Sequence, residues 1–271
     1  MIEKVIRKAA LKALDKVETV KNTRERSNVL GVGASGDITL FIDKVAEQTI
    51  IEYLKEELES FAILSEEAGY RVCGLNPEYT FIIDPIDGSY NAKRGLALYT
   101  ISIAVSRGKT FSDIVAGVVV SIDRQFIFEA YKGKGAYLNN IKLDPKGVDT
   151  IKGSVIAISA HPRGDSKAFK IASKILHRGG RVRILGSASL EACLVASGIF
   201  DAYIEWWNSL RVVDIAAAYI ILMEAGCPVK VEGTIGNRDP LLSLKERISI
   251  FSANSQELFD EINELLLHLE D

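Results

Sequence analysis

The chain has 271 residues and a mass of 29.7 kDa, which is enough for two medium domains with buried cores, and we expect two. Its 33 Lys and Arg residues against 36 Asp and Glu residues give a net charge of −3, which excludes a general attraction to nucleic acid. No apolar run is long enough to cross a membrane, and three scattered cysteines are typical of a reducing compartment, so we expect a cytoplasmic protein.

Two helices and a glycine-rich segment are predicted at the start of the chain. Residues 2–22 have apolar side chains at helical spacing and are predicted to form an amphipathic helix. Residues 31–37, with the sequence GVGASGD, are predicted to form a mobile loop that lacks the Lys-Ser or Lys-Thr of a P-loop. Asp43 stands near the start of a second predicted helix, which runs to about residue 58, and capping alone would explain a carboxylate there.

Acidic residues follow two predicted apolar strands. Residues 61–65 are followed by Glu66 and Glu67, and residues 80–83 are followed by Asp84 and Asp87. Carboxylates that are held close together repel one another unless a cation or a proton intervenes, and hard oxygen ligands favour Mg²⁺ over zinc. The strand ends therefore predict a magnesium site. The alternatives are a capped surface turn after residue 83 and a solvated turn at Glu67.

The turn after the second strand combines a proline and a glycine. Pro85 has no N–H group to donate, so we expect it to end the strand pairing. Gly88 permits unusual backbone angles and a close approach of a ligand. The turn thus directs Asp84 and Asp87 toward one point.

The middle of the chain predicts an extension of the same sheet. Residues 99–105, 115–121 and 125–131 are predicted to be antiparallel strands joined by short turns. Residues 133–140 predict a turn and a bulge before a brief strand. Residues 144–149 are polar and contain Pro and Gly, so we expect a boundary there between domains 1–145 and 146–271.

The second half alternates between predicted strands and helices, which is typical of an α/β arrangement. The predicted strands are 155–159, 181–185, 202–205 and 247–253, and the predicted helices are 166–177, 190–197, 215–225 and 257–269. Residues 186–189 precede a helix, where free N–H groups bind a ligand hydroxyl or phosphate, although ordinary serine capping needs no ligand. Asp214 precedes an apolar helix and is either a cap or a metal ligand, and sequence order leaves both open.

Four pieces of the chain now follow one pattern. They are Asp43, then Ser65-Glu66-Glu67, then Asp84-Pro85-Ile86-Asp87-Gly88-Ser89, then Val213-Asp214-Ile215-Ala216-Ala217 with Glu224-Ala225-Gly226. In this order the chain resembles the inositol monophosphatase and fructose-1,6-bisphosphatase superfamily, and most of all its compact archaeal dual-activity members. The resemblance covers nearly the whole length. It implies an α/β (α+β) fold, a layered αβαβα sandwich of the sugar phosphatase type, with the active site between two subdomains.

The resemblance also implies a role for each site residue. The implied Mg²⁺ ligands, for two or three ions that Mn²⁺ can replace, are Glu66, Asp84, Asp87, Asp214 and the carbonyl group of Ile86. Asp43 and Ser89 match the pair that orients and helps to deprotonate the attacking water, with Glu66 as a further catalytic residue, and Gly88 and Ser89 would hold the phosphate. The implied substrate-binding residues are Gly186, Ser187, Ala188, Ser189 and Glu205. Arg183 is the candidate for a distal phosphate because a guanidinium group suits phosphate, although a surface or interface ion pair is the alternative.

The implied activity is Mg²⁺-dependent hydrolysis of fructose 1,6-bisphosphate, inositol 1-phosphate or both, by direct attack of a water molecule that the metal activates. Residues 31–37 would close over this site, and the enzyme would be a homodimer that binds no nucleic acid and no membrane. The alternatives are a 3′-phosphoadenosine 5′-phosphate phosphatase and a catalytically silent, metal-dependent binding or regulatory protein on the same scaffold. Val213 stands where the family commonly has Trp, and Ala92 where it commonly has an aromatic residue; both predict changed packing rather than lost catalysis.

Overall fold

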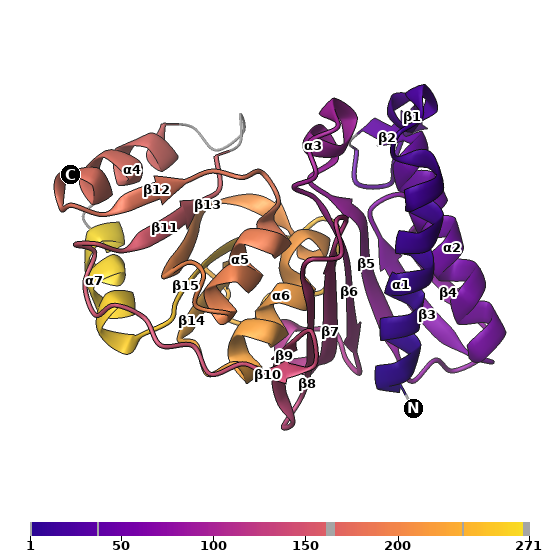
Figure 1. Ribbon diagram of the computed structural model, residues 1–271. Coiled ribbons are helices and arrows are strands. Elements are labelled where there is room, and N and C mark those ends of the chain that lie inside the picture. The colour runs from indigo at the N-terminus through magenta and orange to yellow at the C-terminus, as the bar shows by residue number, and fades with distance from the viewer. Residues whose placement is uncertain (1, 37, 161–165, 235, 268–271) are drawn as a thin grey trace.

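The computed structural model describes residues 2–36, 38–160, 166–234 and 236–267, and they form five layers (Figure 1). One outer layer holds helices α1 (Ile2–Val20) and α2 (Phe41–Glu57), and the other holds α4 (Lys167–His177) and α7 (Gln256–Leu267). Between two β-sheets lie α5 (Ala188–Ala196) and α6 (Val212–Glu224). The predicted αβαβα sandwich is confirmed.

The first sheet has eight strands in the order β10-β9-β8-β7-β6-β5-β3-β4. Their bounds are β3 (Phe61–Ser65), β4 (Gly69–Cys73), β5 (Thr80–Asp87), β6 (Thr100–Ser106), β7 (Ile114–Ser121), β8 (Ile127–Tyr131), β9 (Gly135–Leu138) and β10 (Ile141–Lys142). The three antiparallel strands predicted in the middle of the chain are confirmed as β6, β7 and β8. Strands β3 and β5 run parallel, so their carboxyl ends, and the acidic residues there, meet at one edge of the sheet.

Strand β5 does not end at Pro85. It pairs with β6 at Asp84 and again at Asp87, and a bulge between these two residues accommodates the proline. The prediction that Pro85 ends the pairing was therefore wrong. A residue in a bulge has no partner on the neighbouring strand, so the pairing does not need the N–H group that proline lacks. Both aspartates are consequently held by the sheet on either side of the bulge. The short helix α3 (Ser89–Arg94) follows directly.

The glycine-rich segment belongs to a two-stranded hairpin of β1 (Val29–Val32) and β2 (Ile38–Leu40), preceded by the 3₁₀ helix η1 (Arg24–Ser27). The prediction of a mobile loop at residues 31–37 was wrong in placing Gly31 and Val32 outside a strand, because both pair with β2; Asp37 lies outside the described residues. The hairpin is held against the turn after β3, because the N–H groups of Ala34 and Ser35 donate to the carbonyl oxygens of Glu67 and Glu66 at 3.2 and 3.0 Å.

The second sheet has the order β12-β11-β13-β15-β14. Its strands are β11 (Val155–Ile158), β12 (Arg181–Arg183), β13 (Ala202–Arg211), β14 (Val229–Gly233) and β15 (Arg247–Ala253), and the 3₁₀ helix η2 (Phe111–Asp113) precedes β7. One apolar core joins α5 and α6 to both sheets, a second lies between the first sheet and α1 and α2, and a third surrounds α4 and α7. Because the first core contains residues from both sheets, the packing does not separate the chain into two independent cores. The predicted domain boundary at residues 144–149 stays a prediction.

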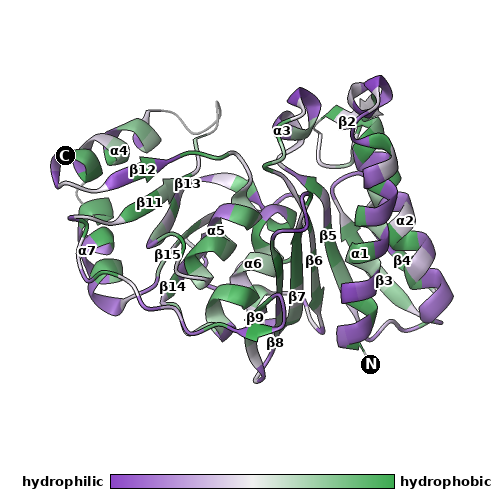
Figure 2. Cartoon of the chain, viewed as in Figure 1, coloured by the Kyte–Doolittle hydropathy of each residue, from purple (hydrophilic) through white to green (hydrophobic). Residues whose placement is uncertain are grey.

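Hydropathy follows the layers (Figure 2). Helices α5 and α6 are apolar around most of their circumference, as expected for helices covered by a sheet on two sides, whereas α1 and α2 show polar outer faces. None of the helices in the described part of the chain is long and apolar enough to cross a membrane. Glycine at position 117 of β7 lets α6 approach the first sheet, since a Cβ there would lie 2.7 Å from the carbonyl oxygen of Ala217. The start of α6 is thereby brought beside the ends of β3 and β5.

Candidate active site

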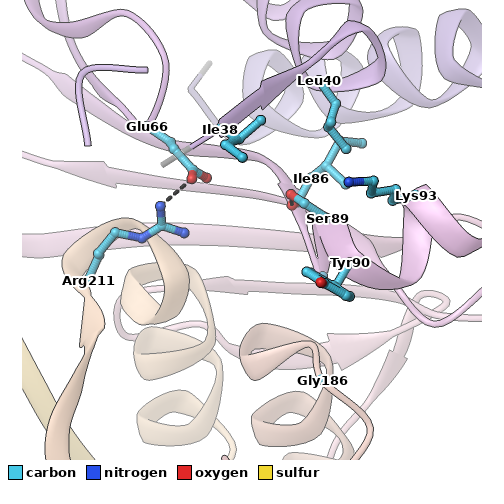
Figure 3. Close-up of a pocket in the computed structure, with 10 residues that line it drawn as sticks. Ile38, Leu40, Glu66, Ile86, Ser89, Tyr90, Lys93, Gly186 and Arg211 are labelled. Atoms are coloured by element: carbon cyan, nitrogen blue, oxygen red, sulfur yellow. Dashed lines mark hydrogen bonds and ion pairs between the residues drawn. The ribbon is translucent and has the colours of Figure 1, made fainter. Parts of the chain in front are cut away.

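A cavity of about 370 Å³ opens where the ends of β3 and β5 meet the β1–β2 hairpin, α3 and the start of α6 (Figure 3). Its lining residues are Ile38, Leu40, Glu66, Ile86, Gly88, Ser89, Tyr90, Lys93, Gly186 and Arg211. Five of them, Glu66, Ile86, Gly88, Ser89 and Gly186, are site residues predicted from the sequence. The other five were missed, because their contribution depends on how the hairpin, α3 and β13 fold around the strand ends.

Four buried carboxylates, Glu66, Asp84, Asp87 and Asp214, lie near one another beside this cavity, and of these Glu66 lines it. Burial raises the pKa of Asp84 well above its usual range, and the charges of Glu66, Asp87 and Asp214 raise it further. One oxygen of Asp84 accepts the N–H of Ile86 at 3.1 Å, whereas its Oδ2 is buried without a hydrogen-bond partner among the described residues. A buried carboxylate oxygen without a donor is unfavourable, so a cation is the partner that this donor set fits.

Asp87 faces the start of α5. Its carboxylate accepts hydrogen bonds from the N–H groups of Ala188 and Ser189 at 3.2 and 2.7 Å, and from the hydroxyl groups of Ser187 and Ser189 at 2.6 and 2.5 Å. Burial raises the pKa of Asp87, and these hydrogen bonds oppose the shift. The structure therefore brings the predicted substrate segment, residues 186–189, against a predicted metal ligand from the other sheet.

Asp43 and Ser89 lie together, as the resemblance implies. The Ser89 hydroxyl is 3.4 Å from Oδ1 of Asp43 and 2.9 Å from the carbonyl oxygen of Ile86. Oδ2 of Asp43 accepts the N–H of Leu40 at 2.7 Å and so caps α2. Burial raises the pKa of Asp43 to about 8; the hydrogen bond from Leu40 opposes that shift, and the charge of Glu66 adds to it. Capping uses one oxygen and leaves the other facing Ser89.

Arg211, at the end of β13, is the most connected of the residues that sequence reasoning missed. Its Nε and Nη2 lie 2.9 and 2.7 Å from Oδ1 of Asp214, and its Nη1 pairs with Oε1 of Glu66 and lies 3.3 Å from the hydroxyl of Ser35. Burial acts to lower the pKa of Arg211, but the charges of Asp214, Glu66 and Asp84 outweigh that effect and raise it. The guanidinium and the Glu66 carboxylate point at one another across the cavity (Figure 3).

The contacts of Arg211 and Asp87 keep the acidic side chains from meeting at one point. Within residues 2–36, 38–160, 166–234 and 236–267, no three Asp, Glu, His or Cys side chains form a preassembled metal cluster. The reason is visible in the contacts: Arg211 bridges Glu66 and Asp214, while the oxygens of Asp87 are bound to the start of α5. Burial raises the pKa of Glu66 to about 7, the charge of Arg211 opposes that shift, and Asp214 adds to it.

Of the six predicted substrate residues, only Gly186 lines the cavity; residues 187–189 contact Asp87 instead, and the other two lie elsewhere. Glu205 is fully buried in β13, with one oxygen accepting the N–H of Ser209 at 2.8 Å and the other without a partner in the described part of the chain. Arg183 is exposed on the edge strand β12, where its Nη1 donates to the carbonyl oxygen of Val182 at 2.9 Å. Lys93 of α3, in contrast, lines the cavity and was not predicted.

Comparison with known proteins identifies the family to which this site belongs. The sequence model of the inositol monophosphatase family matches residues 1–266. The chain belongs to the inositol monophosphatase family. A family member from Methanocaldococcus jannaschii, named fructose-1,6-bisphosphatase/inositol-1-monophosphatase, is 37% identical over 246 residues, which cover 90% of each chain. The family relationship predicted from the motifs is thus confirmed.

Two further members of the family are informative. A bifunctional NADP phosphatase/NAD kinase from Methanocaldococcus jannaschii is 32% identical over 284 residues, which cover 91% of this chain and 48% of that longer protein. The crystal structure of an inositol monophosphatase–fructose 1,6-bisphosphatase superimposes with a TM-score of 0.79 at 32% identity, covering 97% of this chain and 98% of the other. The fold is therefore that of the family over essentially the whole chain.

Proposed function

We propose that this protein is a Mg²⁺-dependent phosphate monoester hydrolase that acts on fructose 1,6-bisphosphate, inositol 1-phosphate or both. The observation that carries the proposal is the buried, unpartnered Oδ2 of Asp84, which lies among three further buried carboxylates beside an open cavity. An acidic cluster of this kind repels a phosphate unless divalent cations lie between them. Membership of the family and the names of its relatives support the same activity.

The proposed metal ligands are Glu66, Asp84, Asp87, Asp214 and the carbonyl oxygen of Ile86, holding two or three Mg²⁺ ions that Mn²⁺ can replace. When bound, Mg²⁺ at such a site lowers the pKa of a water molecule and neutralises charge on the leaving oxygen. The all-oxygen donor set is the one that Mg²⁺ prefers.

The residues of the chain then perform three tasks. The Ser89 hydroxyl orients the attacking water, and Asp43, which reaches Ser89 through Oδ1, receives the proton by way of that hydroxyl. The N–H groups of Gly88 and Ser89 hold the phosphate oxygens. Residues 186–189 bind substrate hydroxyl groups beside Asp87, and Glu205, which is buried in this structure, would join them only if the substrate opens access to it.

A distal phosphate requires a cation at the far side of the cavity. Arg183 is the residue proposed from the sequence, and it would have to reach the cavity from the exposed edge of β12. Lys93 already lines the cavity and provides a second candidate. Comparing KM for fructose 1,6-bisphosphate between Arg183→Met and Lys93→Met decides between them, because only loss of the true distal contact raises KM without changing the hydrolysis of inositol 1-phosphate.

The proposal is tested by measuring phosphate release during a Mg²⁺ titration with four substrates: fructose 1,6-bisphosphate, inositol 1-phosphate, 3′-phosphoadenosine 5′-phosphate and NADP. We expect the first two to be hydrolysed best. NADP is included because a relative at 32% identity is named an NADP phosphatase. Preference for either nucleotide would replace the proposed substrate class, and no release from any substrate would favour the silent binding protein.

We also propose that the enzyme is a cytoplasmic homodimer. Several large apolar side chains are exposed on the β1–β2 hairpin and on α3, namely Val29, Leu30, Val32, Ile38 and Tyr90. Sedimentation equilibrium measures the mass in solution directly. A mass of 29.7 kDa for the native protein would exclude the dimer.

A further inference from the structure

Arg211 joins three parts of the molecule that come together only in the folded chain. Its guanidinium reaches Asp214 at the start of α6, Glu66 after β3, and Ser35 in the hairpin. The side chain is 14% exposed, and the Glu66 and Asp214 side chains are 9% and 11% exposed. This is a largely buried ion-pair cluster rather than a surface salt bridge, so its charges are only weakly screened by solvent.

The same oxygen atoms are needed by the metal. Oδ1 of Asp214 accepts from both Nε and Nη2 of Arg211, and Oε1 of Glu66 accepts from Nη1. A divalent cation that coordinates these oxygens takes the lone pairs that the guanidinium now uses. Two positive groups this close also repel strongly in a poorly solvated site. Arg211 and the metal therefore cannot both bind Glu66 and Asp214 in this geometry.

Arg211 is not needed to start helix α6. The N-terminal cap of that helix is the backbone N–H of Arg211, which donates to Oδ2 of Asp214 at 2.7 Å. Any residue other than proline provides that N–H group. Replacement of the Arg211 side chain thus removes the charge and leaves the cap in place, which separates an electrostatic role from a structural one.

We propose that Arg211 is an internal competitor of the divalent metal, which pairs with Glu66 and Asp214 when no metal is bound and leaves them when the metal binds. The inference rests on the proposed function only in taking these carboxylates as metal ligands. It explains how a cluster of buried acidic residues stays folded without metal, and it gives Arg211 control over the metal concentration at which the enzyme becomes active. Ser35 shares Nη1 of Arg211, so the hairpin loses this one contact at the same step and keeps its backbone hydrogen bonds to Glu66 and Glu67.

The test uses Mg²⁺ alone, titrated calorimetrically into the full-length protein, together with the melting temperature in EDTA. Arg211→Met is expected to bind Mg²⁺ at least about tenfold more tightly than the wild type, a gain of about 1.4 kcal/mol. In EDTA it is expected to melt at a lower temperature, because the carboxylates lose their counter-ion. Arg247→Met is the matched control: Arg247 is paired with Arg211 across β13 and β15, and its guanidinium donates to the carbonyl oxygens of Leu244 and Glu246.

Several results would overturn the inference. Unchanged or weaker Mg²⁺ binding by Arg211→Met would show that Arg211 positions the ligands instead of competing for them. If Arg247→Met binds Mg²⁺ as much more tightly as Arg211→Met does, the effect comes from the change in net charge and not from competition at Glu66 and Asp214. If Arg211→Met does not fold, Arg211→Lys, which keeps one charge but loses the two-sided bridge, is expected to bind Mg²⁺ at least about threefold more tightly, and equal or weaker binding there would refute the proposal.

The two proposals fail in distinguishable ways. Wild-type protein that binds Mg²⁺ but hydrolyses no phosphate ester would overturn the proposed function and leave the competition testable by calorimetry. Wild-type protein that hydrolyses the substrate, with no tightening in Arg211→Met, would overturn the competition alone. Wild-type protein that binds no Mg²⁺ at any concentration would overturn both.

Discussion

Replacing Gly117 by alanine is expected to damage the site from a distance. Gly117 lies in β7 where α6 crosses the first sheet, and a Cβ there would lie 2.6 Å from Cγ2 of Ile220, 2.7 Å from the carbonyl oxygen of Ala217 and 3.1 Å from its Cα. Ordinary contact begins at 3.4 Å, so helix and strand have to separate by about 0.7 Å at this point. The obstructing atoms of Ala217 belong to the backbone, so no side-chain rotation relieves the contact.

The cost follows from this displacement. Forcing one extra carbon into a close-packed contact costs about 1–3 kcal/mol, and we expect about 2 kcal/mol for Gly117→Ala. Helix α6 also carries Asp214, one turn before Ala217, so the shift moves a proposed metal ligand relative to Asp84. Misplacement of a site group by a fraction of an ångström costs about 10- to 100-fold in activity. Stability and Mg²⁺ activation should therefore fall together.

Urea unfolding measures the first effect, and phosphate release during a Mg²⁺ titration measures the second. Val115→Ile is the control, because it adds one carbon to the same strand at a half-buried position, where we expect a change below about 1 kcal/mol. A free energy of unfolding within about 0.5 kcal/mol of the wild type, with an unchanged Mg²⁺ midpoint, would refute the argument that glycine is needed for the approach of α6.

Three further predictions concern the site. Asp84→Asn and Asp214→Asn should each lower Mg²⁺-dependent turnover by at least about 100-fold while circular dichroism shows a folded protein, and near-normal turnover in both would contradict the assignment of the metal ligands. Ser89→Ala should lower kcat by about 100-fold or more, whereas Ser89→Thr, which keeps the hydroxyl, should stay within about tenfold of the wild type; equal rates in the two variants would remove Ser89 from the proton path. Burial raises the pKa of Glu191 from 4.5 to about 8, so the folded protein keeps a proton that the unfolded chain has released, and stability should fall by up to about 1.4 kcal/mol per pH unit as the pH rises between these values. Glu191→Gln should make the slope between pH 5 and pH 8, measured by urea unfolding, shallower, while the raised pKa values of Asp43 and Glu66 keep part of it; an unchanged slope would exclude Glu191 as a contributor.

Most of the predicted strands lie inside the sheets; the exception is the prediction for 181–185, which contains the edge strand β12. The predictions for residues 61–65 and 247–253 coincide with β3 and β15, both of which are buried and paired on two sides. The strands that were not predicted are β1, β2, β4, β9 and β14; β9 falls in the segment predicted as a turn and a bulge, and the others form the hairpin or lie at sheet edges. An edge strand has one side open to solvent and needs no continuous apolar run. The hairpin strand β1 is exposed at every position, so its sequence carries no burial pattern.

The site residues likewise fall into those that local sequence predicts and those that it does not. Its acidic residues were found because each follows an apolar strand or begins a helix, which is information contained in a few neighbouring residues. Arg211 was missed because its partners Glu66 and Ser35 lie more than a hundred residues away in the chain, and only its spacing of three residues from Asp214 is local. Lys93 was missed for the same reason, since the cavity that it lines is closed by the hairpin and by β13. Tertiary contacts of this kind leave no mark in a single sequence.

Capping was the alternative to a catalytic role for Asp43 and to a metal-ligand role for Asp214, and in the structure the cap of each helix leaves one carboxylate oxygen for the predicted role. Each residue uses Oδ2 to accept a backbone N–H at 2.7 Å at the start of its helix, from Leu40 just before α2 and from Arg211 just before α6, and each turns Oδ1 toward the site. Asp87 likewise caps α5 from the other sheet. Because the cap fixes the orientation of the side chain, the start of a helix holds a charged ligand in place at no further conformational cost. An asparagine keeps one carbonyl oxygen for the cap and loses the charge, which is the physical reason to expect that Asp214→Asn folds and does not turn over.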